Sequence, residues 1–403
     1  MKKTTTKDWK IKTLGEVCSF HNGLWKGKKP PYETVGVIRN TNFTKDGNLD
    51  DSDIAILEVE VKQFSKRQLE YGDIILEKSG GGPKQPVGRV IVFDKRDGKY
   101  SFSNFTSVIR INYDSQLDFV YLHRFLYFLY ISGYTEKLQK HTTGIRNLDF
   151  AEYKNTQVPL PPLTEQKRIV KILDEKFREI EELRNLTKQQ MADSKELFES
   201  RLSDVILSND SVDWMTVPIG EVADLKQGLA INAKTDYLID PNGSLPLLRI
   251  KDLKHKTEEI FIDASKASKE VHVYPEDIIY SRTGQVGLVF KGFKGILHNN
   301  SFKVNPVKDV SRDYLFWYLQ SKIFFDQVTH FAKRAAQPDI SHKSFKTILF
   351  SYPKSIARQN KIAKELDQLS AKTKELETIF HQKIADLEEL KKSYLADAFA
   401  GKL

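Results

Sequence analysis

The chain has 403 residues, of which 40% are hydrophobic and 29% are charged, so it can form two or more globular domains. Its net charge of +9 favours a polyanionic partner such as nucleic acid. Cys18 is the only cysteine, which excludes an intramolecular disulfide or a cysteine-based zinc cluster and fits a reducing cytosol. No stretch has the apolar run of a signal peptide or of a membrane span, so we expect a cytoplasmic protein with no membrane partner.

Short β-rich runs and turn signals extend to about residue 158. Strands are predicted at residues 73–76 and 88–93, and a loop at 79–83, where three glycines precede a proline. Residues 119–129 have the dense apolar content of a buried helix. Strands and helices are mixed without strict alternation, which indicates an α+β domain.

A long polar helix is predicted after the prolines at 159–162. Prolines resist helix formation, so we expect Thr164 to be the N-cap and Glu165 to lie in the first turn. Such a polar helix with a narrow apolar seam requires a helical partner. The predicted seam residues are Ile169, Leu173, Phe177, Ile180, Leu183, Met191, Leu197, Phe198, Leu202 and Val205.

The second half of the chain repeats these elements. Strands are predicted at 277–280 and 287–290, a buried helix at 314–319, and a second long helix from Ser355 to a glycine stop at Gly401. The seam of this helix comprises Leu366, Leu369, Thr373, Leu376, Phe380, Ile384, Leu387, Leu390, Tyr394 and Ala398.

The repetition extends to the letters of the sequence. Residues 9–24 (WKIKTLGEVCSFHNGL) align with residues 214–229 (WMTVPIGEVADLKQGL), and Gln166 has its counterpart in Gln359. A period of about two hundred residues is too long for a solenoid, so it indicates tandem duplication. We predict a pseudo-twofold symmetric α+β chain with domains at 1–158 and 209–352 and helices at 159–208 and 353–403. The helices are expected to pair antiparallel within the chain; the alternatives are packing on their own domains or pairing between molecules.

Polar and basic loops occupy matching places in the two halves. Arg, Lys, Asn and Gln present the donors and acceptors that read base edges, whereas Lys, Ser and Thr suit phosphates. The candidate DNA-binding residues of the first half are Lys26, Lys28, Lys78, Ser79, Lys84, Gln85, Thr143, Arg146 and Asn147. Those of the second half are Asn232, Lys234, Arg282, Thr283, Gln285, Lys333, Arg334 and Gln337. The alternative for each is a solvated basic loop.

Motifs for catalysis are weak. The glycine-rich residues 79–89 lack the Gly-Lys-Ser/Thr ending of a phosphate-binding loop. Asp73, Glu77 and Lys78 suggest a metal-dependent nuclease only faintly, because Ser281 replaces Glu77 in the second copy. The nine histidines lack metal-ligand spacing, and no S-adenosylmethionine motif is visible. We therefore expect no catalytic residue, no metal and no cofactor on this chain.

Residues 160–170 (LPPLTEQKRIV), the helix that follows, the second domain and the closing AFAGKL together resemble the specificity subunit of a type I restriction-modification system. The resemblance covers the whole chain and preserves the order of its parts. The second copy departs from the family pattern at Arg358, where the acidic residue before Gln359 is missing.

The resemblance implies a DNA-binding, non-catalytic subunit whose domains each recognise one half of a split, asymmetric site on double-stranded DNA. The helices would set the gap and dock two modification subunits, which bind S-adenosylmethionine, while a restriction subunit cleaves DNA. The expected docking face contains Glu179, Glu181, Glu182, Lys188, Glu375, Glu388, Glu389 and Lys391. The alternatives are a coiled-coil scaffold that binds proteins and an enzyme with an unrecognised site.

Overall fold

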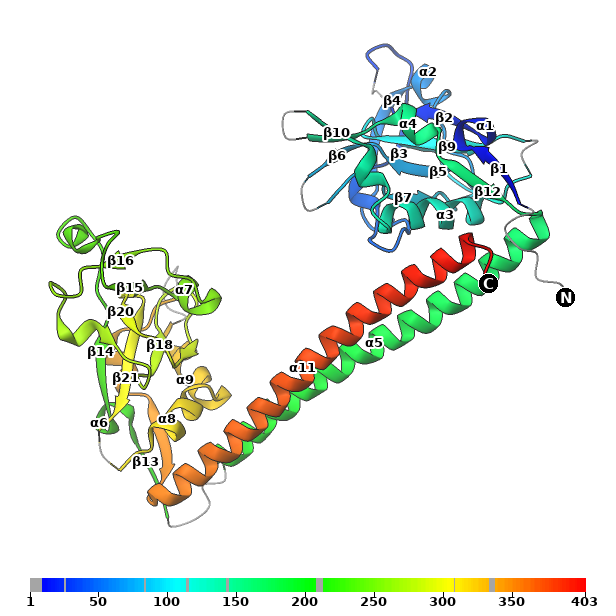
Figure 1. The fold of residues 1–403 in the computed structure, drawn as a ribbon. Helices are drawn as coiled ribbons and strands as arrows, with labels where there is room; N and C mark the ends of the chain where they lie inside the picture. Colours follow the sequence, from blue (N-terminus) through cyan, green and yellow to red (C-terminus); the bar gives the residue numbers. More distant parts are fainter. Residues whose placement is uncertain are drawn as a thin grey trace. The chain divides into compact units, whose positions relative to one another are not determined.

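The computed structural model describes residues 9–24, 27–82, 85–113, 116–142, 145–207, 213–307, 309–332 and 338–403. The chain divides into two compact units. Unit 1 comprises Met1–Thr187 with Gln382–Leu403, and unit 2 comprises Lys188–His381. The long helices α5 (Leu163–Leu207) and α11 (Ile356–Phe399) each contribute one segment to each unit (Figure 1). Both units mix sheets and helices, so the predicted α+β class is confirmed.

The described residues of unit 1 form four small sheets. Strand β1 (Lys10–Thr13) pairs with β12 (Gln157–Leu160), just before α5. The other sheets have the orders β2-β9-β5-β7, β4-β3-β8 and β10-β11-β6. Their strands are β2 (Cys18–Asn22), β3 (Tyr32–Ile38), β4 (Ala55–Glu60), β5 (Ile74–Glu77), β6 (Ser79–Gly81), β7 (Val90–Val92), β8 (Tyr100–Phe102), β9 (Thr106–Ile111), β10 (Gln139–Thr142) and β11 (Ile145–Leu148). The predicted loop at 79–83 is wrong in part, because β6 lies there and pairs with β11.

Short helices complete the described part of unit 1. They are α1 (Leu14–Val17), η2 (Asn40–Asn42), α2 (Val61–Phe64), α3 (Phe119–Ile131), η3 (Thr135–Leu138) and α4 (Phe150–Lys154). Helix α3 is the predicted buried helix, and its side chains pack with Leu173 of α5 and Leu395 of α11 in one core cluster. Cys18 belongs to this cluster, and burial raises the pKa of its thiol to about 12.

Unit 2 repeats this plan. Strand β13 (Trp214–Pro218) pairs with β22 (Leu349–Pro353), and the larger sheets have the orders β14-β21-β18-β19 and β16-β15-β20-β17. The remaining strands are β14 (Ala223–Gln227), β15 (Leu245–Leu248), β16 (Phe261–Ile262), β17 (His272–Val273), β18 (Ile279–Ser281), β19 (Val289–Phe290), β20 (Gly295–Leu297) and β21 (Ser301–Pro306). The helices are α6 (Ile219–Val222), η4 (Asp236–Leu238), α7 (Ile250–His255), η5 (Lys269–Val271), α8 (Arg312–Leu319), α9 (Lys322–Ala332) and α10 (His342–Lys346).

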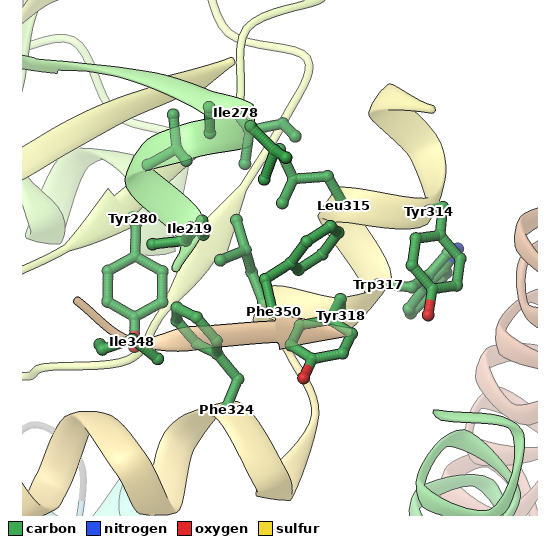
Figure 2. Close-up of a cluster of buried hydrophobic side chains, with 14 of the residues drawn as sticks. Ile219, Ile278, Tyr280, Tyr314, Leu315, Trp317, Tyr318, Phe324, Ile348 and Phe350 are labelled. Atoms are coloured by element: carbon green, nitrogen blue, oxygen red, sulfur yellow. The ribbon is translucent and has the colours of Figure 1, made fainter. Parts of the chain in front are cut away.

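The core of unit 2 is rich in aromatic side chains, which Figure 2 shows between α8, α9 and β22. The rings of Tyr318 and Phe350 meet edge to face with centroids 4.6 Å apart, a favourable geometry for aromatic pairs. Tyr314 lies in the same cluster and donates its hydroxyl to the carbonyl of Ser351. The predicted buried helix at 314–319 is therefore confirmed as part of this core.

The two long helices begin with different hydrogen bonds. Helix α5 begins at Leu163, so the prediction of Thr164 as N-cap is wrong. The carbonyl of Pro162 accepts the amides of Glu165 (2.8 Å) and Gln166 (3.0 Å), which closes the first turn one residue before Thr164. Helix α11 begins at Ile356, so the predicted start near Ser355 is confirmed, and the hydroxyl of Ser355 accepts the amide of Arg358.

Segments of the two helices run antiparallel in each unit. In unit 1, Arg184 of α5 contacts Glu388 of α11 at 3.1 Å. In unit 2, Lys195 of α5 contacts Glu377 of α11 at 3.1 Å. In unit 1, Arg168 near the start of α5 also donates to the carbonyl of Leu403, just after α11, at 2.7 Å, so residue numbers rise along one helix while they fall along the other. Among the described residues, neither helix is apolar enough to cross a membrane.

Four residues that were predicted to lie in the buried seam of the long helices are exposed, so their assignment is wrong. Most of the seam is buried or half-buried, but Leu183, Leu197, Leu376 and Leu390 are 41–66% exposed. Thr187 explains one of these errors: it is fully buried, one heptad after Ile180, and its hydroxyl donates to the carbonyl of Leu183. The seam therefore passes through a threonine that the apolar pattern could not reveal.

The prediction that Lys391 lies on the exposed docking face is also wrong. Lys391 is only 8% exposed, and its ammonium group donates to Asp46 in the loop after η2 at 2.9 Å. Arg184 reaches the same carboxylate at 3.3 Å. The hydrocarbon stem of lysine accounts for this burial, since it packs on apolar surface while the charge keeps a partner.

A buried glutamine fastens each domain to its following helix. Gln166 accepts the amide of Asp118 (2.8 Å) and donates to the carbonyls of Pro161 (2.8 Å) and Gln116 (3.1 Å). Gln166 is fully buried and links the start of α5 to the loop before α3. Gln359 is also fully buried and links the start of α11 to the loop before α8.

Gln359 makes the same three contacts in unit 2. It accepts the amide of Ser311 (2.6 Å) and donates to the carbonyls of Pro353 (2.7 Å) and Asp309 (2.9 Å). The missing acidic residue at Arg358 leaves this arrangement intact. The duplication seen in the sequence is therefore a duplication of buried contacts.

Candidate nucleic-acid interface

Two predicted clusters of unit 1 come together on the sheet β10-β11-β6. Asn147 of β11 pairs with Ser79 of β6, and Arg146 pairs with Gly81. The hydroxyl of Ser79 donates to Oδ1 of Asn147 at 2.5 Å. We call residues 78–82, 105 and 146–147 patch 1. Its side chains belong to segments that lie about seventy residues apart in the sequence, yet they form one surface.

Lys78 connects patch 1 to the end of β2. Its ammonium group donates to Oδ1 of Asn22 at 2.8 Å, and Asn22 ends the strand that precedes the lysine-rich loop. Burial lowers the pKa of Lys78. Lys28 is exposed, and its backbone amide donates to Glu60 of β4. Gln85 is exposed and closes its loop through hydrogen bonds with Gly82.

Six candidate residues lie outside the described part of the chain. They are Lys26, Lys84, Thr143, Lys333, Arg334 and Gln337.

The equivalent surface of unit 2 is held by an ion pair. Arg282 donates through one guanidinium nitrogen to both carboxylate oxygens of Asp339, at 2.8 and 2.9 Å. Its remaining nitrogens donate to the carbonyls of Ile340 (3.2 Å) and Asn299 (3.4 Å). The hydroxyl of Thr283 donates to Asp339 at 2.6 Å. We call residues 282–285, 300 and 338–340 patch 2. Arg282 thus organises patch 2, and base contact by this residue stays a prediction.

The two patches share a backbone and differ in chemistry. The amides of Lys78 and Ser79 both donate to the carbonyl of Phe105, at 3.0 and 3.2 Å. In unit 2 the amides of Arg282 and Thr283 both donate to Asn300, at 2.8 and 3.4 Å. The pair Ser79–Asn147 corresponds in the same way to Thr283–Asp339.

Other candidates of unit 2 have local partners. Gln285 accepts the ammonium group of Lys254 at 3.1 Å, which adds a lysine from α7 that the sequence did not single out. Lys234 is exposed, and its amide donates to the side chain of Asn232. This turn is stabilised by its own hydrogen bonds.

A buried ion pair supports patch 1 from below. Glu77 is 1% exposed and pairs with Arg89 at 2.7 Å. Asn40, which the sequence reasoning missed, donates to Glu77 (2.9 Å) and to the carbonyl of Ser79 (2.9 Å). Glu77 therefore has a supporting role in this arrangement. Within the described ranges, no group of three or more histidine, cysteine, aspartate or glutamate side chains is placed to hold a metal.

The fold and the two patches define a class of protein: a duplicated α+β chain in which each copy presents a polar surface of its own chemistry. The family model for the type I restriction modification DNA specificity domain matches residues 6–190 and 211–389. The chain therefore belongs to the type I restriction-modification DNA specificity family.

Relatives and solved structures are similar over nearly the whole chain. The chain is 22% identical to the type I restriction enzyme EcoKI specificity subunit of Escherichia coli (strain K12), covering 98% of this chain and 89% of that protein. The HsdS subunit from Thermoanaerobacter tengcongensis gives a TM-score of 0.58 at 21% identity, covering 98% of this chain and 97% of that one.

A chain from the structural work on "complex assembly and conformational transition of the type I R-M system" gives a TM-score of 0.78 at 20% identity. That likeness covers 99% of this chain and 100% of the other. At these identities the solved structures support the fold.

Proposed function

We propose that this chain is the DNA-recognition, non-catalytic subunit of a type I restriction-modification complex. Patch 1 and patch 2 would each recognise one half of a split DNA site. The observation that carries this proposal is the pair of equivalent backbones that present different side chains, Ser79 and Asn147 in one unit and Thr283 and Asp339 in the other. A shared scaffold with unlike side chains suits recognition of two unlike half-sites.

Partner subunits complete the proposed activity. Two modification subunits would dock on the helices and supply S-adenosylmethionine, and a restriction subunit would cleave unmodified DNA. The antiparallel segments of α5 and α11 would set the gap between the half-sites. Exposed acidic side chains such as Glu179 and Glu389 remain available for docking in this proposal.

The test is methylome sequencing of host cells that carry the complete system, with and without this chain. We expect adenine methylation at one split motif, which disappears when the chain is deleted. An Asn147→Ala variant should change one half of the motif and leave the other half intact, because Asn147 belongs to patch 1 alone. Methylation that persists without the chain, or a motif that is not split, would contradict the proposal.

A further inference from the structure

Phe105 presents an aromatic ring on patch 1. It lies between β8 and β9, and its side chain is 47% exposed. Its backbone is fixed, because its carbonyl accepts the amides of both Lys78 and Ser79. The ring lies along Gly80, where a Cβ atom would come within 3.4 Å of the Cδ1 atom of Phe105. One part of the ring is therefore packed while the other faces solvent among candidate DNA-binding side chains.

The fold does not require an aromatic residue at this position. Asn300 occupies it in unit 2 and accepts the equivalent two backbone hydrogen bonds. A second apolar side chain, Ile145, is 51% exposed at the start of β11, next to Arg146 of patch 1. By its spacing from the paired residue Asp339, the sequence counterpart of Ile145 is Gln337. Phe105 of patch 1 and the neighbouring Ile145 are thus apolar at two positions where the sequence of the second copy has amides.

The difference between apolar and amide side chains corresponds to a difference between the bases that they contact. Thymine alone presents a methyl group in the major groove, and apolar side chains contact it, whereas amide side chains pair with adenine. A ring that is half packed on Gly80 can present an edge to a methyl group.

We propose that Phe105 is a specificity-determining residue that contacts the 5-methyl group of a thymine in the half-site recognised by patch 1. This inference rests on the proposed function. It predicts that this half-site contains at least one thymine whose methyl group contributes to binding.

The test uses the chain assembled with its modification subunits and duplexes that carry the motif found by methylome sequencing. Each thymine of the motif is replaced in turn by deoxyuridine, which keeps the base-pairing groups and lacks only the methyl group. At one position of the first half-site we expect the affinity to fall about fourfold, as for the loss of one buried methyl group. In Phe105→Ala this loss should disappear, which is the signature of a direct coupling.

Two controls separate contact from general damage. Phe105→Asn introduces the residue that unit 2 tolerates at this position, and it should abolish the deoxyuridine effect in the same way. Tyr113→Ala removes another exposed aromatic residue, which follows the opposite end of β9, and it should leave the effect unchanged. Deoxyuridine in the second half-site should have the same effect in every variant.

The outcomes distinguish the two proposals. If the native complex prefers its split motif but no deoxyuridine effect depends on Phe105, the Phe105 inference is wrong and the proposed function stands. If the native complex prefers no motif, the proposed function fails and the inference fails with it.

Discussion

The two units attach their domains to the long helices by one shared contact and by others that differ. The shared contact is the buried glutamine, Gln166 or Gln359, which satisfies the same three backbone groups in each unit. In unit 1 a cluster of charges is added, in which Asp46 joins Arg184 and Lys391. In unit 2 the addition is Trp317, which donates its indole nitrogen to Asp367 at 2.9 Å and packs against Phe198.

The difference shows which parts of a duplicated contact are free to diverge. The glutamine amide is neutral and has both donors and acceptors, so it can satisfy a buried loop and a helix start together. Ion pairs and aromatic contacts can replace one another around it, because each needs only two suitable side chains. The charged attachment of unit 1 is expected to be sensitive to salt, whereas that of unit 2 is not.

Replacing the shared contact should have the largest effect. Gln166→Leu should destabilise unit 1, and Gln359→Leu should destabilise unit 2, each by about 3 kcal/mol, because three backbone groups lose their partner in a buried site. Hydrogen exchange measured separately for each unit would show this. Gln189→Leu is the matched control, since Gln189 is exposed and its side-chain amide donates to Asp193 within α5. Equal loss of protection in both units from either variant would contradict the assignment of one glutamine to each unit.

Breaking the charge cluster should have an intermediate effect confined to unit 1. Asp46→Asn removes the carboxylate that faces Lys391 and Arg184, which leaves a largely buried ammonium group without its anion. We expect a loss of about 2 kcal/mol in unit 1, below the full cost of breaking a buried pair because Asp46 is partly exposed.

Unfolding in denaturant at low and high salt measures this effect. The native chain should lose part of the same stability in high salt, and Asp46→Asn should be less sensitive to salt. Asp51→Asn, which breaks the exposed pair with Lys95, serves as the control. A larger effect of Asp51→Asn would overturn the role given to the cluster.

The smallest predicted effect is the pH dependence that His123 gives to unit 1. His123 of α3 is 2% exposed, and burial, with a smaller contribution from the neighbouring Arg124, lowers its pKa to about 3. In the unfolded chain the imidazole of His123 binds a proton near its ordinary pKa of about 6.5, whereas in the folded unit this imidazole stays neutral. This contribution to stability is complete above pH 6.5 and is lost as the pH falls toward 3.

At pH 5.5 the loss amounts to about 1.4 kcal/mol. Phe316 replaces His123 in the second copy, so unit 2 lacks this contribution. His123→Phe should flatten the stability of unit 1 between pH 7 and pH 5, as followed by hydrogen exchange of that unit. The idea is wrong if the variant and the native chain lose stability in parallel over this range.

Periodicity and repetition predicted much of the fold. The buried helices α3 and α8, the strands β5 and β7 and the start of α11 follow from local apolar patterns and caps. The start of α5 was missed because the carbonyl of Pro162, which has no special sequence signal, closes the first turn. Leu183 was assigned to the seam because Thr187, a polar residue, occupies the buried position instead.

The candidate interface was predicted less completely. The clusters around Lys78 and Arg282 follow from glycine-rich, basic composition in matching places. The role of Arg282 depends on Asp339, which lies 57 residues away, and no local pattern reports such a partner. Lys254 and Phe105 reach the patches only through tertiary packing, so the sequence offered no signal for them.

Cys18 is a native probe of the opening of unit 1. It is the chain's one thiol, 3% exposed, and its raised pKa keeps it protonated at neutral pH. A thiol-modifying reagent can react only when unit 1 opens, because the attacking species is the thiolate. The rate of modification therefore measures the rate at which unit 1 opens. Unit 2 has no cysteine and does not contribute, and no label has to be introduced.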